Sequence, residues 1–154
     1  MPLTAYTNFA AVYKLANTAP TDTEGAELAT FIEAYEAIFM TDVLGYKLAK
    51  DFIAAVGEDG GFIGPVAQKW LDLKVGTEFI DKYGRLNKWP GFMNIQDLSP
   101  VVPFVYYKWQ VSRQSYSSGS GERVVLTENS EPTSVTNKIV RAWNSMVDLN
   151  YILD

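Results

Sequence analysis

Carboxylates are the side chains best suited to chemistry in this sequence, because the chain contains neither cysteine nor histidine. Without those two residue types, thiolate nucleophiles, disulfides, histidine-dependent triads and the usual zinc sites lose a required member. Two close carboxylate pairs remain, Glu33 with Glu36 and Glu58 with Asp59. Such pairs do acid–base work only where they converge in a pocket. Their sequence context indicates a solvated helix face and a turn, so we expect no catalytic residue, no metal site, no cofactor and no enzyme.

Two other patterns could bind phosphate or nucleic acid. The glycine-rich stretches at 57–61 and 119–121 lack the Lys-Ser/Thr pair of a nucleotide-binding loop, and neither lies between a clear strand and a helix. Tyr106, Tyr107, Lys108 and Arg113 interleave aromatic and basic residues, as single-strand binders do. The chain is acidic overall and has no cluster of Lys and Arg, so we expect no tight grip on DNA.

The acidic charge is concentrated in the first part of the chain. Residues 1–60 carry 3 Lys and Arg against 9 Asp and Glu, a net charge of −6, whereas residues 61–154 carry 10 against 9, a net charge of +1. This asymmetry fits either a solvated acidic face or a surface complementary to a partner. No apolar run approaches the roughly 20 residues that span a bilayer, and the first residues lack the pattern of a signal peptide. We therefore expect no membrane segment and synthesis in the cytoplasm.

At 154 residues, 47% of them hydrophobic, the chain suits a single domain over 1–154. Residues 1–20 are interpreted as an N-terminal arm. A capping box at Thr21 and Glu24 predicts a helix that ends near Met40, with its apolar stripe at Leu28, Phe31, Ile32, Tyr35, Ile38 and Phe39 and its glutamates off that stripe.

Asp42 could cap a second helix, whose stripe would include Leu44, Leu48, Phe52 and Val56. A short third helix is predicted from Pro65 to about Lys74, with Gly76 just past its end. Residues 78–81 and 86–89 flank a glycine-containing turn, which predicts a β-hairpin.

The segment 101–111 is rich in β-branched and aromatic residues and could be a strand, but Ser99-Pro100 before it resembles a helix start. Lack of strict alternation favours a helix at the centre of a bundle. Residues 115–133 are polar and rich in Gly and Ser around Val124, Val125 and Leu126, which predicts a long extended arm. A docked C-terminal helix follows, with its stripe at Val135, Ile139, Ala142, Met146, Leu149 and Leu153. The predicted fold is therefore mainly α, a helical bundle with a small β-hairpin and a long extended arm before the C-terminal helix.

Four tryptophans could in principle form an aromatic ligand cage, but large aromatics on apolar faces are mostly core or subunit contacts. The residues that we expect at a subunit interface are Trp89, Phe92, Tyr107, Val124, Val125, Leu126 and Trp143.

Three stretches resemble a family of small structural proteins of Bacteroidetes phages, including crAss-like phages. The first contains Tyr35-Glu36, 44–48 (LGYKL) and 50–52 (KDF). The second is 88–92 (KWPGF), and the third runs from Ser99-Pro100 through 104–109 (FVYYKW) and the arm 119–130 to 140–144 (VRAWN). The resemblance covers roughly residues 28–150, while the first 27 residues depart from the pattern.

The resemblance implies a head-to-tail connector or adaptor, a virion structural protein in the phage neck. Such subunits form a homo-oligomeric ring, expected here to be a dodecamer, below the portal protein and against other neck or tail proteins. The protein would be made in host cytoplasm and pass DNA without sequence-specific binding, and an acidic surface facing the channel would repel phosphate.

Two rival interpretations differ in class. The chain could be a monomeric phage-encoded binding module that docks on a host protein through its acidic N-terminal half. It could also be a carboxylate-dependent hydrolase, which would require two acidic residues converging in a pocket.

Overall fold

The computed structural model describes residues 3–9, 13–15, 23–57, 60–93, 99–113, 115–118, 121–124 and 136–150. A short 3₁₀ turn, η1, covers Tyr6–Asn8. The α-helices are α1 (Thr23–Leu44), α2 (Tyr46–Ala55), α3 (Gln68–Val75), α4 (Val101–Ser112) and α5 (Thr136–Asn150). The strands are β1 (Thr77–Ile80), β2 (Leu86–Trp89), β3 (Ser115–Ser118) and β4 (Gly121–Val124). The chain is thus mainly α-helical, as the sequence predicts.

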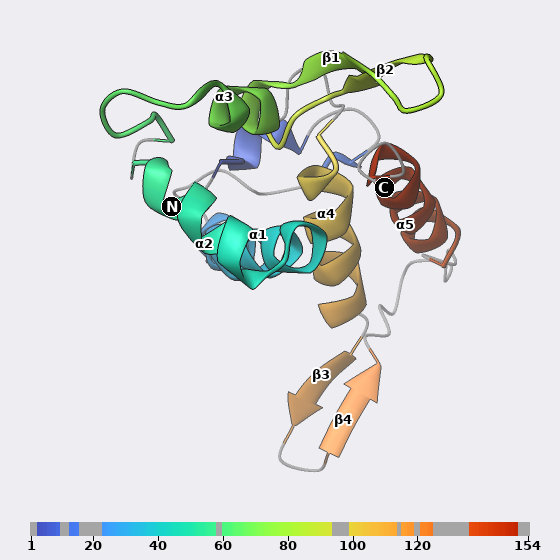
Figure 1. Cartoon of the computed structure of the whole chain (residues 1–154). Helices are drawn as coiled ribbons and strands as arrows, with labels where there is room; N and C mark the ends of the chain where they lie inside the picture. The colour runs from blue at the N-terminus through green and yellow to red at the C-terminus, as the bar shows by residue number, and fades with distance from the viewer. Residues whose placement is uncertain are drawn as a thin grey trace.

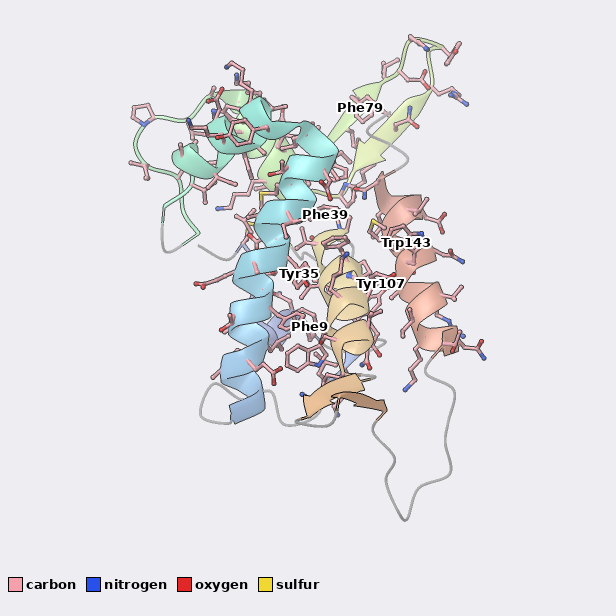
Figure 2. The ribbon with its side chains drawn as sticks, turned by 90° about the horizontal axis from the view of Figure 1, so that it is seen from below. Phe9, Tyr35, Phe39, Phe79, Tyr107 and Trp143 are labelled. Carbon is pink, nitrogen blue, oxygen red and sulfur yellow. The ribbon has the colours of Figure 1, made fainter. Side chains whose placement is uncertain are left out.

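Helix α4 lies between α1 on one side and α5 on the other (Figures 1 and 2). Its residues Val101 to Tyr106 are all buried, as is Trp109. A helix that is apolar nearly all round can be stable only where neighbours cover it on several sides. The prediction of a central helix at this position, in place of a strand, is therefore confirmed.

Helix α1 is longer than predicted and ends at Leu44, not near Met40. Asp42 therefore lies inside α1 and does not cap the next helix. Gly45, with a φ of 77°, makes the break, because glycine adopts positive φ at little cost. Helix α2 then begins at Tyr46 and buries Ala49 and Phe52. The expected capping residue Thr21 lies outside the described residues.

Helix α3 and the first hairpin form one unit. The helix begins three residues later than predicted and stops at Gly76, which has a φ of 97°. Strands β1 and β2 pair antiparallel, with Thr77 opposite Trp89 and Ile80 opposite Leu86, so the predicted hairpin is confirmed. Its return segment runs beside the end of α3, where the backbone N–H of Phe92 donates to the Leu73 carbonyl at 3.0 Å.

Two glycines allow the close approach between these segments. A Cβ on Gly76 would lie 2.5 Å from the Trp89 carbonyl oxygen, and one on Gly91 would lie 2.6 Å from the Lys74 carbonyl oxygen. Both residues also have positive φ. The Trp89 indole adds a bond from Nε1 to the Leu73 carbonyl at 3.1 Å. The hairpin is thereby held to α3 through backbone contact.

Ser99 joins this unit to α4. Its hydroxyl donates to the Phe92 carbonyl at 2.7 Å and accepts the backbone N–H of Val101 at 3.4 Å. Pro100 then precedes the first helical residue, where a missing N–H costs nothing. The helix therefore begins one residue later than predicted, with Pro100 as the N-cap and Val101 as the first helical residue.

The predicted extended arm contains a second hairpin in its described part. Strands β3 and β4 pair antiparallel, with Ser115 opposite Val124 and Ser118 opposite Gly121 (Figure 1). The structure therefore adds a second hairpin to the predicted one. Seryl and glycyl residues gave little strand signal, because β propensity reflects side-chain packing. Residues 125–133 of the predicted arm, with Val125 and Leu126, lie outside the described residues.

The core joins the helices to the N-terminal arm and the first hairpin. Phe92 lies near its centre, with its ring 6.2 Å from Phe39 of α1, 5.8 Å from Phe52 of α2 and 5.1 Å from Trp89 of β2. In the N-terminal arm, Leu3, Phe9 and Tyr13 are buried, so its described residues pack on the body.

Candidate functional site

The carboxylates that could have done chemistry are separated by the fold. Glu33 is exposed on α1, whereas Glu36, about one turn further along the helix, is buried with 2% exposure. The expectation that Glu36 is a solvated helix-face residue was therefore wrong. Glu58 and Asp59 lie outside the described residues.

Glu36 holds the start of the chain. Its Oε1 accepts the backbone N–H of Leu3 at 2.5 Å, and its Oε2 accepts the backbone N–H of Thr4 at 3.2 Å and the Thr4 hydroxyl at 3.0 Å. Burial raises the pKa of Glu36 above its usual 4.5, although these donors act in the opposite direction. The arrangement fits a structural clasp between the N-terminal arm and α1.

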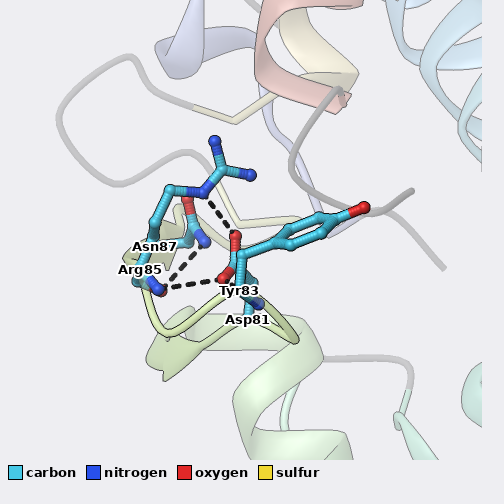
Figure 3. A network of polar contacts seen from close by, with 4 residues as sticks. All are labelled: Asp81, Tyr83, Arg85 and Asn87. Atoms are coloured by element: carbon cyan, nitrogen blue, oxygen red, sulfur yellow. Dashed lines mark hydrogen bonds and ion pairs between the residues drawn. The ribbon is translucent and has the colours of Figure 1, made fainter.

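Asp81 organises the tip of the first hairpin (Figure 3). Its Oδ1 accepts the backbone N–H groups of Tyr83 at 2.8 Å and Arg85 at 2.9 Å, and its Oδ2 forms an ion pair with Arg85 Nε at 2.9 Å. The bond from the Arg85 backbone, followed by those from Tyr83 and the Arg85 side chain, lowers the pKa of Asp81 to about 2. The tip is therefore a fixed structure that presents Ile80, Tyr83 and Leu86 to solvent.

A larger exposed surface lies across α4 and α5. On α5, Val140, Trp143 and Val147 follow one another at helical spacing and are between 42 and 51% exposed. On α4, Tyr107 lies with its ring 5.1 Å from that of Trp143, and Val111 follows one turn later at 44% exposure. We call these five residues the apolar patch. Contiguous apolar side chains on a surface commonly mark an interaction site.

Only part of the expected interface belongs to this surface. Tyr107 and Trp143 lie side by side in it (Figure 2). Trp89 and Phe92 are 2% and 0% exposed, so their side chains are part of the core of this chain. Val124 lies in β4, and Val125 and Leu126 are outside the described residues.

Val111, Val140 and Val147 were not among the residues expected at an interface. A signal was available on the C-terminal helix, because residues 140, 143 and 147 form a second apolar row beside the buried row that contains Ala142 and Met146. A helix with two apolar rows has more apolar surface than one neighbouring helix can cover.

The opposite side of the molecule carries a different surface. Helix α1 presents Ala26, Thr30, Glu33, Ala34, Ala37 and Ile38 to solvent, which we call the alanine face. Ile38 was expected in the buried stripe, but it is 45% exposed. The helix carries five carboxylates and no Lys or Arg. It is therefore an acidic helix with a flat, small-residue outer face.

A shallow depression of about 350 Å³ lies between α1 and α2, and Thr41, Tyr46, Lys50, Ile53 and Ala54 line it. None of these five lining residues is acidic. Among the described residues, no group of three or more acidic side chains is placed to hold a metal ion. No helix within the described ranges is long and apolar enough to cross a membrane.

Comparison with known proteins adds no assignment to this picture. No family model matches the chain, and neither the curated proteins nor the solved structures that were searched contain a match.

Proposed function

We propose that this protein is a virion structural subunit, a head-to-tail connector that forms a ring below the portal in a phage neck. The observation that carries the assembly role is the apolar patch on α4 and α5, whose four most exposed members are over two fifths accessible. A side chain such as Trp143 gains free energy from burial, at about 25 cal/mol per Å² of apolar surface removed from water. A second copy or a neck protein can supply that burial.

The neck location rests on the resemblance of 44–52, 88–92 and 99–144 to connector proteins of Bacteroidetes phages. A ring of such subunits, twelve-fold by the same resemblance, would contact the portal protein above and other neck or tail proteins below. Its subunits would be made in host cytoplasm and then incorporated into the virion.

Deletion of the gene tests this role. Infected cells should then accumulate filled or empty heads that lack tails, because the next component has no surface on which to dock. Mass spectrometry of purified virions should find the protein, and electron microscopy should place it at the neck. Infectious particles of normal yield without the protein would contradict the connector role.

The acidic outer side of α1 favours a second candidate, a monomeric module that binds a basic surface of a host protein. This module would be recovered with a host factor from infected cells and would be absent from purified virions. The same virion analysis therefore separates the two functions.

A further inference from the structure

We infer that the apolar patch of one subunit packs on the alanine face of α1 in the next copy. This inference rests on the proposed connector function and names the surfaces that would build its ring. The first support is their placement. In both views α4 lies between α1 and α5, so the alanine face and the α5 part of the apolar patch belong to helices on opposite flanks of α4 (Figures 1 and 2).

A contact between two different surfaces is heterologous. Each subunit that uses its apolar patch on one neighbour still offers its alanine face to another, so the contact repeats from copy to copy and forms a ring where the rotation between copies closes. A two-fold dimer, in contrast, would bury the same patch from both copies and stop growing. Of these two arrangements, only the heterologous one produces a connector ring.

Charge supports the choice of partner. Helix α1 presents Glu27, Glu33 and Asp42 to solvent and has no basic residue, whereas α5 carries Lys138 and Arg141 against a single acid, Asp148. Lys138, Arg141 and Glu33 are all exposed. Opposite charges at the rim of an apolar contact favour the correct partner and register, and two copies of α5 face to face would place like charges together.

Shape supports it as well. Ala26, Ala34 and Ala37 give α1 a shallow surface along about 17 Å of helix, at 1.5 Å per residue. Small side chains let a second helix approach closely, and the bulky Trp143 and the two valines of α5 can fill the space above them. Ile38, exposed at the end of that face, would be covered by the same contact.

Engineered cysteines test the contact sharply, because the natural chain has none. Full-length Ala34→Cys and Val140→Cys variants should be oxidised separately and as an equal mixture. Both sites are exposed, so both variants should fold. We expect a crosslinked dimer in the mixture and none in either variant alone. The double variant should give a ladder of higher oligomers. A Tyr46→Cys variant, at a more exposed site on α2, should not crosslink to Val140→Cys.

Efficient crosslinking of Val140→Cys to itself would overturn the inference in favour of a two-fold contact, and the absence of any crosslink between 34 and 140 would also overturn it. Arg141→Glu and Glu33→Arg should each weaken self-association by about tenfold, and their combination should restore it. Rings in virions without the 34–140 crosslink would reject this contact and leave the connector role standing. The crosslink in a protein absent from virions would support the contact and reject the connector role.

Discussion

At the scale of single residues, Glu36 gives the chain a pH dependence of definite sign. Burial raises its pKa above 4.5, so its contribution to stability is present at low pH and is lost as the pH rises through the folded-state pKa. The free energy of unfolding of the wild type should therefore fall, relative to that of Glu36→Gln, as the pH rises above about 4.5. Urea unfolding at several pH values measures this difference.

Glu33→Gln is the matched control, because Glu33 is an exposed glutamate on the same helix. Its free energy of unfolding should stay close to that of the wild type, because the side chain is exposed. A wild type that instead gains stability over Glu36→Gln as the pH rises would mean that the three donors at Glu36 outweigh burial.

The paired glycines allow a second test at this scale. Gly76→Ala and Gly91→Ala should each destabilise the protein by well over about 1 kcal/mol, because each combines a positive φ with backbone atoms closer than 3 Å to the new Cβ. Gly84→Ala is the control, since Gly84 has a φ of 79° but open space around its Cβ position. It should cost only the conformational penalty, about 1 kcal/mol. Equal losses at all three sites, measured by thermal unfolding, would show that the close contacts do not matter.

Prediction from sequence at the residue scale fails where the partner is distant along the chain. The 3.6-residue period located Leu28, Ile32 and Phe39 correctly in the buried stripe. It excluded Glu36, because the backbone donors of Leu3 and Thr4 that make its burial possible leave no mark in the local pattern. It also included Ile38, whose exposure depends on which flank of α1 the other helices cover.

At the scale of elements, the tip of the β1–β2 hairpin should loosen only in strong acid. Asp81 has a pKa of about 2, lowered from its ordinary value of 3.8. The carboxylate therefore stays ionised and keeps its hydrogen bonds until the pH falls to about 2. The NMR resonances of the Tyr83 and Arg85 amides should therefore titrate with a midpoint near 2. Glu78→Gln, on the adjacent strand, should leave that midpoint unchanged, and Asp81→Asn should abolish it. A midpoint near 4 would contradict the network.

Elements with local signals were predicted well, and elements without them were not. Gly76 marked the end of α3, and Ser99-Pro100 marked the start of α4, because caps act within a few residues. The boundary between α1 and α2 was missed, since the chain continues in helix past Asp42 and breaks at Gly45. The β3–β4 pair was missed because its pairing involves backbone groups in a segment of small polar residues.

At the scale of the whole molecule, Phe92 and Trp143 should respond differently to truncation. Phe92→Ala should lower the free energy of unfolding by about 3 to 5 kcal/mol, because the ring is fully buried and joins α1, α2 and the first hairpin. Trp143→Ala should cost less, because the indole is 42% exposed in the single chain. Chemical unfolding of the dilute protein measures both.

In an assembled ring, Trp143→Ala should have a larger effect than it has in the single chain. Trp143 would then be covered, and Trp143→Ala should weaken assembly more than it weakens the fold. Sedimentation at increasing concentration separates the two effects. If Trp143→Ala lowered the free energy of unfolding of the monomer as much as Phe92→Ala does, the Trp143 indole would belong to the core.

The position of α4 between α1 and α5 also matters while the chain is being made. Helices α1 and α4 can pack as soon as both have left the ribosome, but the side of α4 that α5 covers stays open until residues 136–150 follow. At 5–20 residues per second, the stretch from Ser112 to Asn150 takes roughly 2 to 8 s to synthesise. During that interval the nascent chain exposes the apolar side of α4. Nascent chains on neighbouring ribosomes of the same mRNA expose the same surface nearby. Chains ended by a stop codon after β4 should therefore aggregate or be degraded, and slow translation of this stretch should lower the yield of soluble protein.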